Sequence, residues 1–127
     1  LVLACPDGYS PDQSIMERAL DRNVGKIVLT SDPVEAVNNA DVVYTDVWAS
    51  MGQEGELDNR KRVFEPFQVN ETLLKKAADN AIVMHCLPAH RDEEITDEVM
   101  ESRHSVIYDQ AENRLHVQKA IMATLME

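Results

Sequence analysis

Short apolar runs alternate along the chain with stretches whose apolar residues recur at helical spacing. Near-continuous apolar runs of five or six residues, bounded by polar or turn-forming residues, are typical of strands that are covered on both faces of a sheet. We therefore predict five strands: Leu1–Cys5, Lys26–Thr30, Asp41–Asp46, Ala81–Cys86 and Ser105–Asp109.

Capping residues mark where the intervening helices begin. Ser10 as N-cap with Pro11 at the first helical position predicts one start, and Asp32 followed by Pro33 predicts another. Asn and Thr side chains can accept hydrogen bonds from the first free N–H groups of a helix. Further helices are expected over 56–67, over 71–79 after Asn70, over 97–102 after Thr96, and over 110–126 at the end.

This alternation of strands and helices predicts an α/β fold. We expect a parallel sheet of about five strands with crossover helices on both faces, Rossmann-like, incomplete at its N-terminal edge, in a single partial domain over 1–127. Ligands of such sheets bind beyond the carboxyl ends of the strands. Two predicted strands end in long polar loops, from Asp46 onward and from His85 onward. We expect both loops to face one crevice.

The composition narrows the class of partner. The chain has 12 basic and 23 acidic residues and a formal net charge of −11, which disfavours nucleic acid and anionic lipid as partners. No apolar run approaches the roughly 18 residues of a membrane span, and the first residues lack the pattern of a signal peptide. Cys5 and Cys86 lie far apart and predict no disulfide framework. A cytoplasmic protein is expected.

The segment "HCLPAHR" at 85–91 concentrates residues that could do chemistry. His85, Cys86 and His90 could in principle bind zinc, but adjacent ligands strain tetrahedral geometry and no fourth ligand stands at the usual spacing. Cys86 could instead be a nucleophile activated by a neighbouring imidazole, although no glycines for an oxyanion hole lie nearby. The third alternative is structural: a satisfied histidine, a small buried cysteine and a loop anchored by Arg91.

The loop "TDVWASMGQE" at 45–54 offers groups of another kind. Asp46 at a strand end can hold a cationic amine by a charge-assisted hydrogen bond. Ser50 supplies a hydroxyl, and Met51 next to a glycine lets backbone amides come close to a carboxylate. An anion for an ammonium group and neutral donors for a carboxylate are what a zwitterionic amino acid needs. A capping Asp in a flexible loop is the simpler interpretation.

Three separated motifs carry a resemblance: "DVWASMGQE" at 46–54, "HCLPAHR" at 85–91 and "DQAENRLHVQKAIM" at 109–122. Together they resemble the signatures of the ornithine carbamoyltransferase family, and the likeness extends from the first predicted strand to the last helix. His-Cys-Leu-Pro differs from the His-Pro-Leu-Pro of the aspartate-using relative. The resemblance implies transfer of a carbamoyl group from carbamoyl phosphate to the δ-amino group of L-ornithine, giving citrulline and phosphate without metal or cofactor.

The resemblance also implies roles for particular residues. Asp46, Ser50 and Met51 would hold the α-amino and α-carboxylate end of ornithine. Cys86 would be catalytic, as the proton acceptor beside the attacking amine, and the backbone carbonyls of Cys86 and Leu87 would receive the carbamoyl NH2. Arg114 would donate to carbamoyl phosphate.

Whole members of this family are homotrimers whose active sites lie between domains and subunits. Their first half, with the phosphate-binding loop, has no counterpart in these residues, so we expect the isolated chain to be inactive. The closing helix, about 110–126, would pack on that half through Leu115, Ile121, Met122 and Leu125. One alternative is a stand-alone amino-acid-binding or regulatory module; another is a Cys–His hydrolase.

Overall fold

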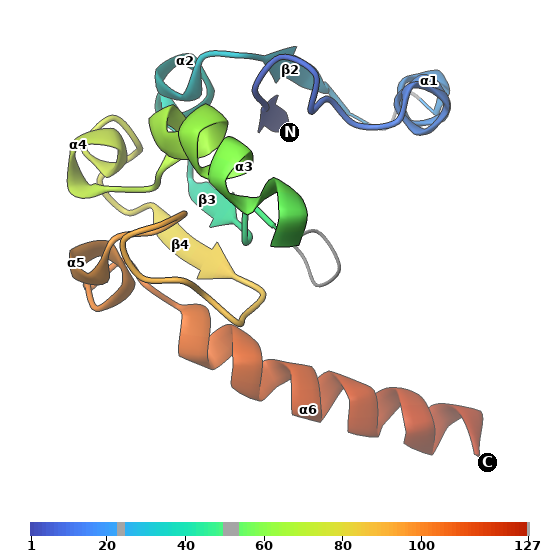
Figure 1. Cartoon of the computed structure of the whole chain (residues 1–127). Helices are drawn as coiled ribbons and strands as arrows, with labels where there is room; N and C mark the ends of the chain where they lie inside the picture. The colour runs from blue at the N-terminus through green and yellow to red at the C-terminus, as the bar shows by residue number, and fades with distance from the viewer. Residues whose placement is uncertain (23–24, 50–53, 127) are drawn as a thin grey trace.

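All the strands in the described part of the chain form parallel pairs. The computed structural model describes residues 1–22, 25–49 and 54–126. Strand β1 (Val2–Ala4) pairs with β2 (Val28–Thr30), and β3 (Val42–Thr45) pairs with β4 (Ile82–His85), as Figure 1 shows. Helices connect and flank these strands, so the predicted α/β class is confirmed.

The register of β3 and β4 decides where the chemistry lies. Val42 is opposite Ile82 and Thr45 is opposite His85, so the two strands run in step and end at the same edge. The next residues, Asp46 and Cys86, therefore leave the sheet side by side. The two polar loops were expected to face one crevice, and their first residues do lie next to each other at this edge.

Most of the expected helix starts are found. Asp32, Asn70 and Thr96 are N-caps whose side chains accept backbone hydrogen bonds from Val34, Leu73 and Val99. The helical elements are α1 (Gln13–Asp21), α2 (Pro33–Val37), η1 (Glu54–Glu56), α3 (Leu57–Phe64), η2 (Glu65–Phe67), α4 (Glu71–Leu74), α5 (Asp97–Met100) and α6 (Ile107–Leu125).

Several helix boundaries differ from the prediction, two of them for clear local reasons. The N-cap of α1 is Asp12, not Ser10, because the Asp12 carboxylate accepts hydrogen bonds from the N–H groups of Ser14 and Ile15. Helix α4 ends at Leu74 instead of continuing to residue 79. The N–H of Ala77 bonds to the carbonyl of Leu74, three residues back, so the chain tightens into turns there.

The predicted fifth strand over 105–109 is wrong. Ser105 forms a single parallel bridge with Val83, and the Val106 N–H donates to the carbonyl of Val83 at 3.0 Å. From Ile107 onward the backbone is helical, so α6 begins three residues before the predicted start. A short apolar run such as "SVIYD" fits a strand or the buried first turn of a helix equally well.

The core lies around β4, between this strand and residues on both sides of it in the chain. It consists of apolar side chains that are at most 5% exposed: Val69, Val83, Ile95, Val99, Met100 and Ile107. Burying each such side chain contributes roughly 1.5–3 kcal/mol relative to exposure. Ile107 is the residue through which α6 joins this core. The core thus fixes β4, the 85–94 loop and the first turn of α6 relative to one another.

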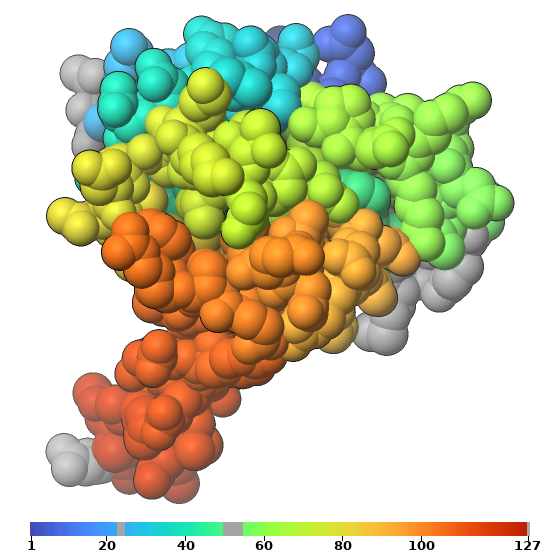
Figure 2. Space-filling model, turned by 90° about the vertical axis from the view of Figure 1, so that its left-hand side faces the viewer, coloured from blue at the N-terminus to red at the C-terminus, as the bar shows by residue number. Residues whose placement is uncertain are grey.

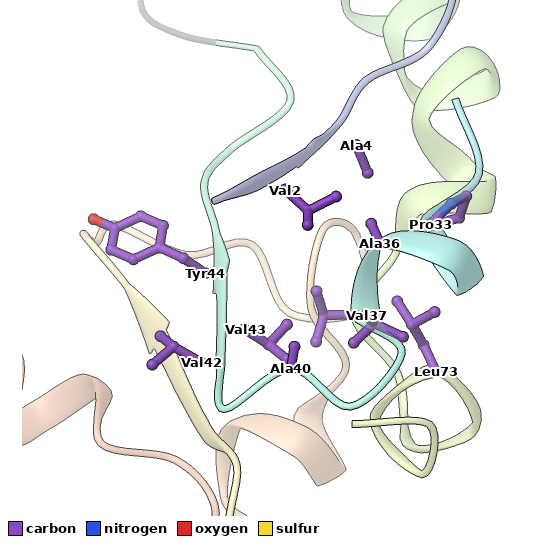
Figure 3. A pocket seen from close by; sticks show the side chains of 11 residues that line it. Val2, Ala4, Pro33, Ala36, Val37, Ala40, Val42, Val43, Tyr44 and Leu73 are labelled. Carbon is purple, nitrogen blue, oxygen red and sulfur yellow. The ribbon is translucent and has the colours of Figure 1, made fainter. Parts of the chain in front are cut away.

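The described strands form two two-stranded sheets, so the expected single sheet of about five strands is not confirmed. Side chains of β1 (Val2, Ala4) and of β3 (Val42, Tyr44) line one cavity of about 120 Å³ together with α2, as Figure 3 shows. No backbone ladder joins β1 to β3 among the residues that the structure describes.

Helix α6 projects from the body of the molecule, as the space-filling view in Figure 2 shows. Every residue of 111–126 is exposed, and the apolar ones include Leu115, Val117, Ile121, Met122 and Leu125. None of the helices in the described ranges combines the length and apolar character that a membrane crossing requires.

Candidate functional site

The carboxyl ends of β3 and β4 bring three reactive side chains together. A carboxylate oxygen of Asp46, a ring nitrogen of His85 and the Sγ of Cys86 all lie within 4.8 Å of one another. His85 is fully buried, Cys86 is half-buried and Asp46 is exposed. Asp46 accepts a hydrogen bond from the N–H of Val47 at 2.7 Å, which orients its carboxylate. The site therefore has a buried side and an open side.

The surroundings of Cys86 favour the thiol over the thiolate. Burial raises the pKa of Cys86, and the neighbouring Asp46 carboxylate raises it further by accepting from the thiol and by charge repulsion. The Tyr44 hydroxyl opposes these effects and lowers the pKa. Without a ligand, Cys86 is therefore a neutral thiol near pH 7.

Both ring nitrogens of His85 have partners. The Leu87 N–H donates to Nδ1 at 2.8 Å, and Nε2 lies 3.1 Å from Oε1 of Glu94. A backbone N–H can only donate, so Nδ1 is unprotonated and Nε2 carries the proton that Glu94 accepts. No lone pair remains to take a proton from Cys86. This geometry argues against a Cys–His hydrolase and supports the structural interpretation of His85.

The buried carboxylate of Glu94 connects the two ends of the 85–90 segment by hydrogen bonds. Its Oε1 accepts from His85 and, at 2.6 Å, from the N–H of His90, while its side chain is 0% exposed. Its Oε2 has no hydrogen-bond partner among the described residues, and Nδ1 of His90 lies 3.8 Å from it. A buried carboxylate needs such donors because burial without them is costly. Sequence reasoning did not identify Glu94, which looks like one more surface acid in the run "DEE".

The loop that contains Cys86 is fixed at both ends. Leu87 has a φ of 56°, rare for a bulky residue, and precedes a cis bond to Pro88. At the far end, Arg91 pairs with Asp97 and with Glu101, and donates to the Tyr108 hydroxyl at 3.2 Å. These carboxylates raise the pKa of Arg91. The expectation that Arg91 anchors the loop through carboxylates is confirmed.

Helix α6 reaches the site through its first turns. Gln110 accepts from the backbone N–H of His85 at 3.1 Å and donates to the Tyr44 hydroxyl at 3.2 Å, so it connects β3 with β4. Arg114 lies four residues further along α6 and is exposed. Residues four apart lie on the same face of a helix. Arg114 therefore stands one turn beyond the residue that contacts both strands.

The remaining predicted residues, Ser50 and Met51, lie outside the described residues. The start of their loop is held by α3, where Arg60 donates to the Trp48 carbonyl at 3.1 Å. The Trp48 ring stacks near Phe64, with 6.3 Å between centroids. The sequence analysis did not foresee this support, although the aromatic residues of the two segments were visible.

Two clusters in the described part of the chain offer possible metal ligands. In the first, with Asp46 and Cys86, the one free ring lone pair of His85 already accepts from the Leu87 N–H. The second consists of His90, Glu93 and Glu94, where Glu93 pairs with Lys61 at 2.6 Å. The cavity between the strand pairs is lined by apolar groups and Tyr44, so it has no charge that could recognise a zwitterion. Asp46, beside Cys86 at the strand ends, is an exposed charge of the kind that such recognition needs.

Comparison with known proteins identifies the family of this chain. Residues 1–125 match the family model for the Asp/Orn-binding domain of aspartate/ornithine carbamoyltransferase. The chain belongs to the aspartate/ornithine carbamoyltransferase family. The resemblance predicted from the three sequence motifs is therefore confirmed.

Individual carbamoyltransferases are similar throughout the chain. The ornithine carbamoyltransferase of Syntrophus aciditrophicus is 61% identical over 126 residues, covering 99% of this chain and 42% of that protein. The structure of the Pyrococcus furiosus enzyme is 54% identical with a TM-score of 0.87, over 96% of this chain and 40% of that one. The anabolic Campylobacter jejuni enzyme is 39% identical with a TM-score of 0.92, over 98% and 42%. The chain thus spans about two fifths of the length of these relatives.

Proposed function

We propose that this domain supplies the ornithine-binding wall of an ornithine carbamoyltransferase, which transfers the carbamoyl group of carbamoyl phosphate to the δ-amino group of L-ornithine. The observation that carries the proposal is the juxtaposition of Asp46 and Cys86 within 4.8 Å at the paired ends of β3 and β4. Family membership supports the same assignment. The products are L-citrulline and phosphate.

Asp46, Ser50 and Met51 hold the amino-acid end of ornithine. Asp46 is exposed at the strand end, and its carboxylate is oriented by the Val47 N–H, so it can accept from the substrate's ammonium group. Ser50 and Met51 provide the neutral donors for the α-carboxylate. A diamine such as putrescine lacks that carboxylate and gains nothing from these donors.

Cys86 accepts the proton that the attacking amine must lose. The δ-nitrogen attacks the carbamoyl carbon, the bond from that carbon to the phosphate oxygen breaks, and phosphate leaves with the electron pair. Burial and Asp46 raise the pKa of Cys86 in the empty site, but an arriving δ-ammonium is an opposite charge and favours the thiolate, so the thiol releases its proton to solvent as ornithine binds. Ornithine binding thereby prepares the base that deprotonates it.

Carbamoyl phosphate lies between this wall and a second domain. The carbonyls of Cys86 and Leu87 receive its NH2 group, and Arg114 donates to it from α6, one turn beyond Gln110. The exposed apolar residues of α6 pack on the domain that completes the site, and the whole protein is a homotrimer. We further propose that the strand pairs belong to one Rossmann-like layer in the order β2-β1-β3-β4, because β1 and β3 line one cavity.

Steady-state kinetics of the whole protein with Asp46→Asn test the proposal. Losing a charge-assisted contact to ornithine should raise the KM for ornithine about 10- to 100-fold, with little change in the KM for carbamoyl phosphate. Asp41→Asn is the matched control, because Asp41 is an exposed acid just before β3, at its opposite end. Equal kinetics for the two variants would refute the assignment of Asp46.

The alternative of a binding module without catalysis is tested by calorimetry. It requires the isolated chain to bind ornithine at millimolar ligand concentration while the whole protein forms no citrulline. The carbamoyltransferase proposal expects turnover by the whole protein.

A further inference from the structure

Tyr44 and Gln110 form a network beside Cys86 that the proposed reaction does not yet use. Tyr44 lies two residues before Asp46 on the same side of β3, and it is opposite Met84, two residues before Cys86. A tyrosine side chain can reach the diagonal neighbour on an adjacent strand. The hydroxyl of Tyr44 therefore lies on the side of the site where Cys86 and Asp46 meet.

The orientation of the Gln110 amide follows from its partners. The backbone N–H of His85 can only donate, so the oxygen of the Gln110 amide must face it, at 3.1 Å. The amide nitrogen then faces Tyr44 and donates to its hydroxyl oxygen at 3.2 Å. Because Gln110 uses that oxygen as an acceptor, the hydroxyl hydrogen of Tyr44 is free to point elsewhere.

The Cys86 sulfur is the acceptor that this hydrogen can serve. We propose that Tyr44 is a positioning residue for the reaction, whose hydroxyl donates to the Cys86 thiolate, and that Gln110 orients this hydroxyl from α6. The inference rests on the proposed function, because it assigns the pair to the base of that reaction.

Among the described residues, several groups surround Cys86. From β3 these are Asp46 and Tyr44, and from β4 His85. The neutral Gln110 of α6 contacts Tyr44 and the His85 N–H, and Arg114 lies one turn further along α6. His85 has no free lone pair. Asp46 opposes the thiolate, whereas the Tyr44 hydroxyl favours it and lowers the pKa of Cys86. The two residues of β3 therefore act on Cys86 in opposite senses.

Alkylation of Cys86 by iodoacetamide in the whole protein tests this network independently of citrulline formation. Peptide mass spectrometry separates Cys86 from Cys5, and the rate is followed from pH 6 to pH 10, where it reports the thiolate fraction. Tyr44→Phe should move the midpoint of the Cys86 titration to higher pH. At pH values below that midpoint, alkylation should be roughly three- to tenfold slower than in the wild type. Tyr108→Phe is the matched control, because both tyrosines are 54% exposed and Tyr108 contacts Arg91 instead.

Gln110→Met tests the second half of the proposal with Tyr44 intact. It should lower the alkylation rate in the same direction as Tyr44→Phe and add nothing when combined with it, because Gln110 acts through the hydroxyl. In the citrulline assay both variants should lower kcat with the KM for ornithine within about twofold.

Two results would overturn the inference. One is a pH profile of Cys86 alkylation for Tyr44→Phe that matches the profile of Tyr108→Phe. The other is a Gln110→Met substitution that slows alkylation by the same factor in the wild type and in Tyr44→Phe. A whole protein that forms no citrulline would remove the proposed function, yet the alkylation profiles would still decide whether Tyr44 and Gln110 act on Cys86.

Discussion

Replacing Glu94 by alanine should severely destabilise the 85–94 loop, which carries Cys86, and the core beneath it. The Glu94 carboxylate is fully buried and accepts from His85 Nε2 at 3.1 Å and from the His90 N–H at 2.6 Å. A hydrogen bond to a charged group contributes about 1.5–3 kcal/mol, so losing two amounts to roughly 3–6 kcal/mol. Native proteins are stable by only about 5–15 kcal/mol. The substitution thus removes much of the available stability.

Glu94→Gln separates the hydrogen bonds from the charge. The amide oxygen can take the place of Oε1 and keep both donors, and its NH2 group replaces Oε2, which has no partner among the described residues. We expect a change within about 1 kcal/mol, because a buried charge is removed while its hydrogen bonds remain. Glu93→Ala is the matched control: its partly exposed pair with Lys61 should contribute about 0–1 kcal/mol.

The assay is thermal unfolding of the whole protein, combined with hydrogen exchange of the 85–94 segment. Glu94→Ala should lower the midpoint and accelerate exchange there, whereas Glu94→Gln and Glu93→Ala should stay near the wild type. If Glu94→Gln were as damaging as alanine, the charge would matter more than the hydrogen bonds, and the neutral His85 deduced above would be wrong.

Three further predictions concern the same region. Asp46→Asn should speed alkylation of Cys86 at neutral pH, because burial and then the Asp46 carboxylate raise the pKa of that thiol. An unchanged pH profile would refute this. In His85→Asn the amide oxygen can replace Nδ1 as the acceptor for the Leu87 N–H, whereas in His85→Gln the amide nitrogen replaces Nε2 as the donor to Glu94. The kcat for citrulline formation should therefore be about tenfold or more lower in His85→Gln than in His85→Asn. Equal rates would show that the imidazole merely fills space. Asn70→Ala should cost about 1 kcal/mol in unfolding experiments through the lost N-cap bond to Leu73, which is 3.0 Å long; no loss would remove that cap from the account.

The sequence was informative where local chemistry determines structure. Four of the five predicted strands exist, because apolar runs with β-branched residues such as "AIVMHC" favour extended backbone. Asp32, Asn70 and Thr96 act as N-caps because their side chains bond to nearby N–H groups. The meeting of Asp46 with Cys86 followed from one rule, that parallel strands present their carboxyl ends at one edge.

The features that the sequence did not reveal depend on contacts between residues far apart in the chain or on the folded loop. Ile107 begins a helix because the bridge between Ser105 and Val83 ends there, and its apolar run does not reveal this long-range contact. Glu94 escaped notice because its burial depends on donors from His85 and His90, which only the folded loop brings together. Tyr44 and Gln110 are 66 residues apart in sequence, and no local pattern links them.

The central claim is that this domain binds ornithine for carbamoyl transfer, and citrulline formation by the whole protein tests it most directly. Ornithine and putrescine should be offered separately with carbamoyl phosphate, using the wild type and Asp46→Asn at equal concentrations. The account predicts citrulline from ornithine, little carbamoylation of putrescine, and loss of turnover in Asp46→Asn at an ornithine concentration near the wild-type KM. Absence of citrulline with the wild type, or undiminished turnover with Asp46→Asn, would contradict it.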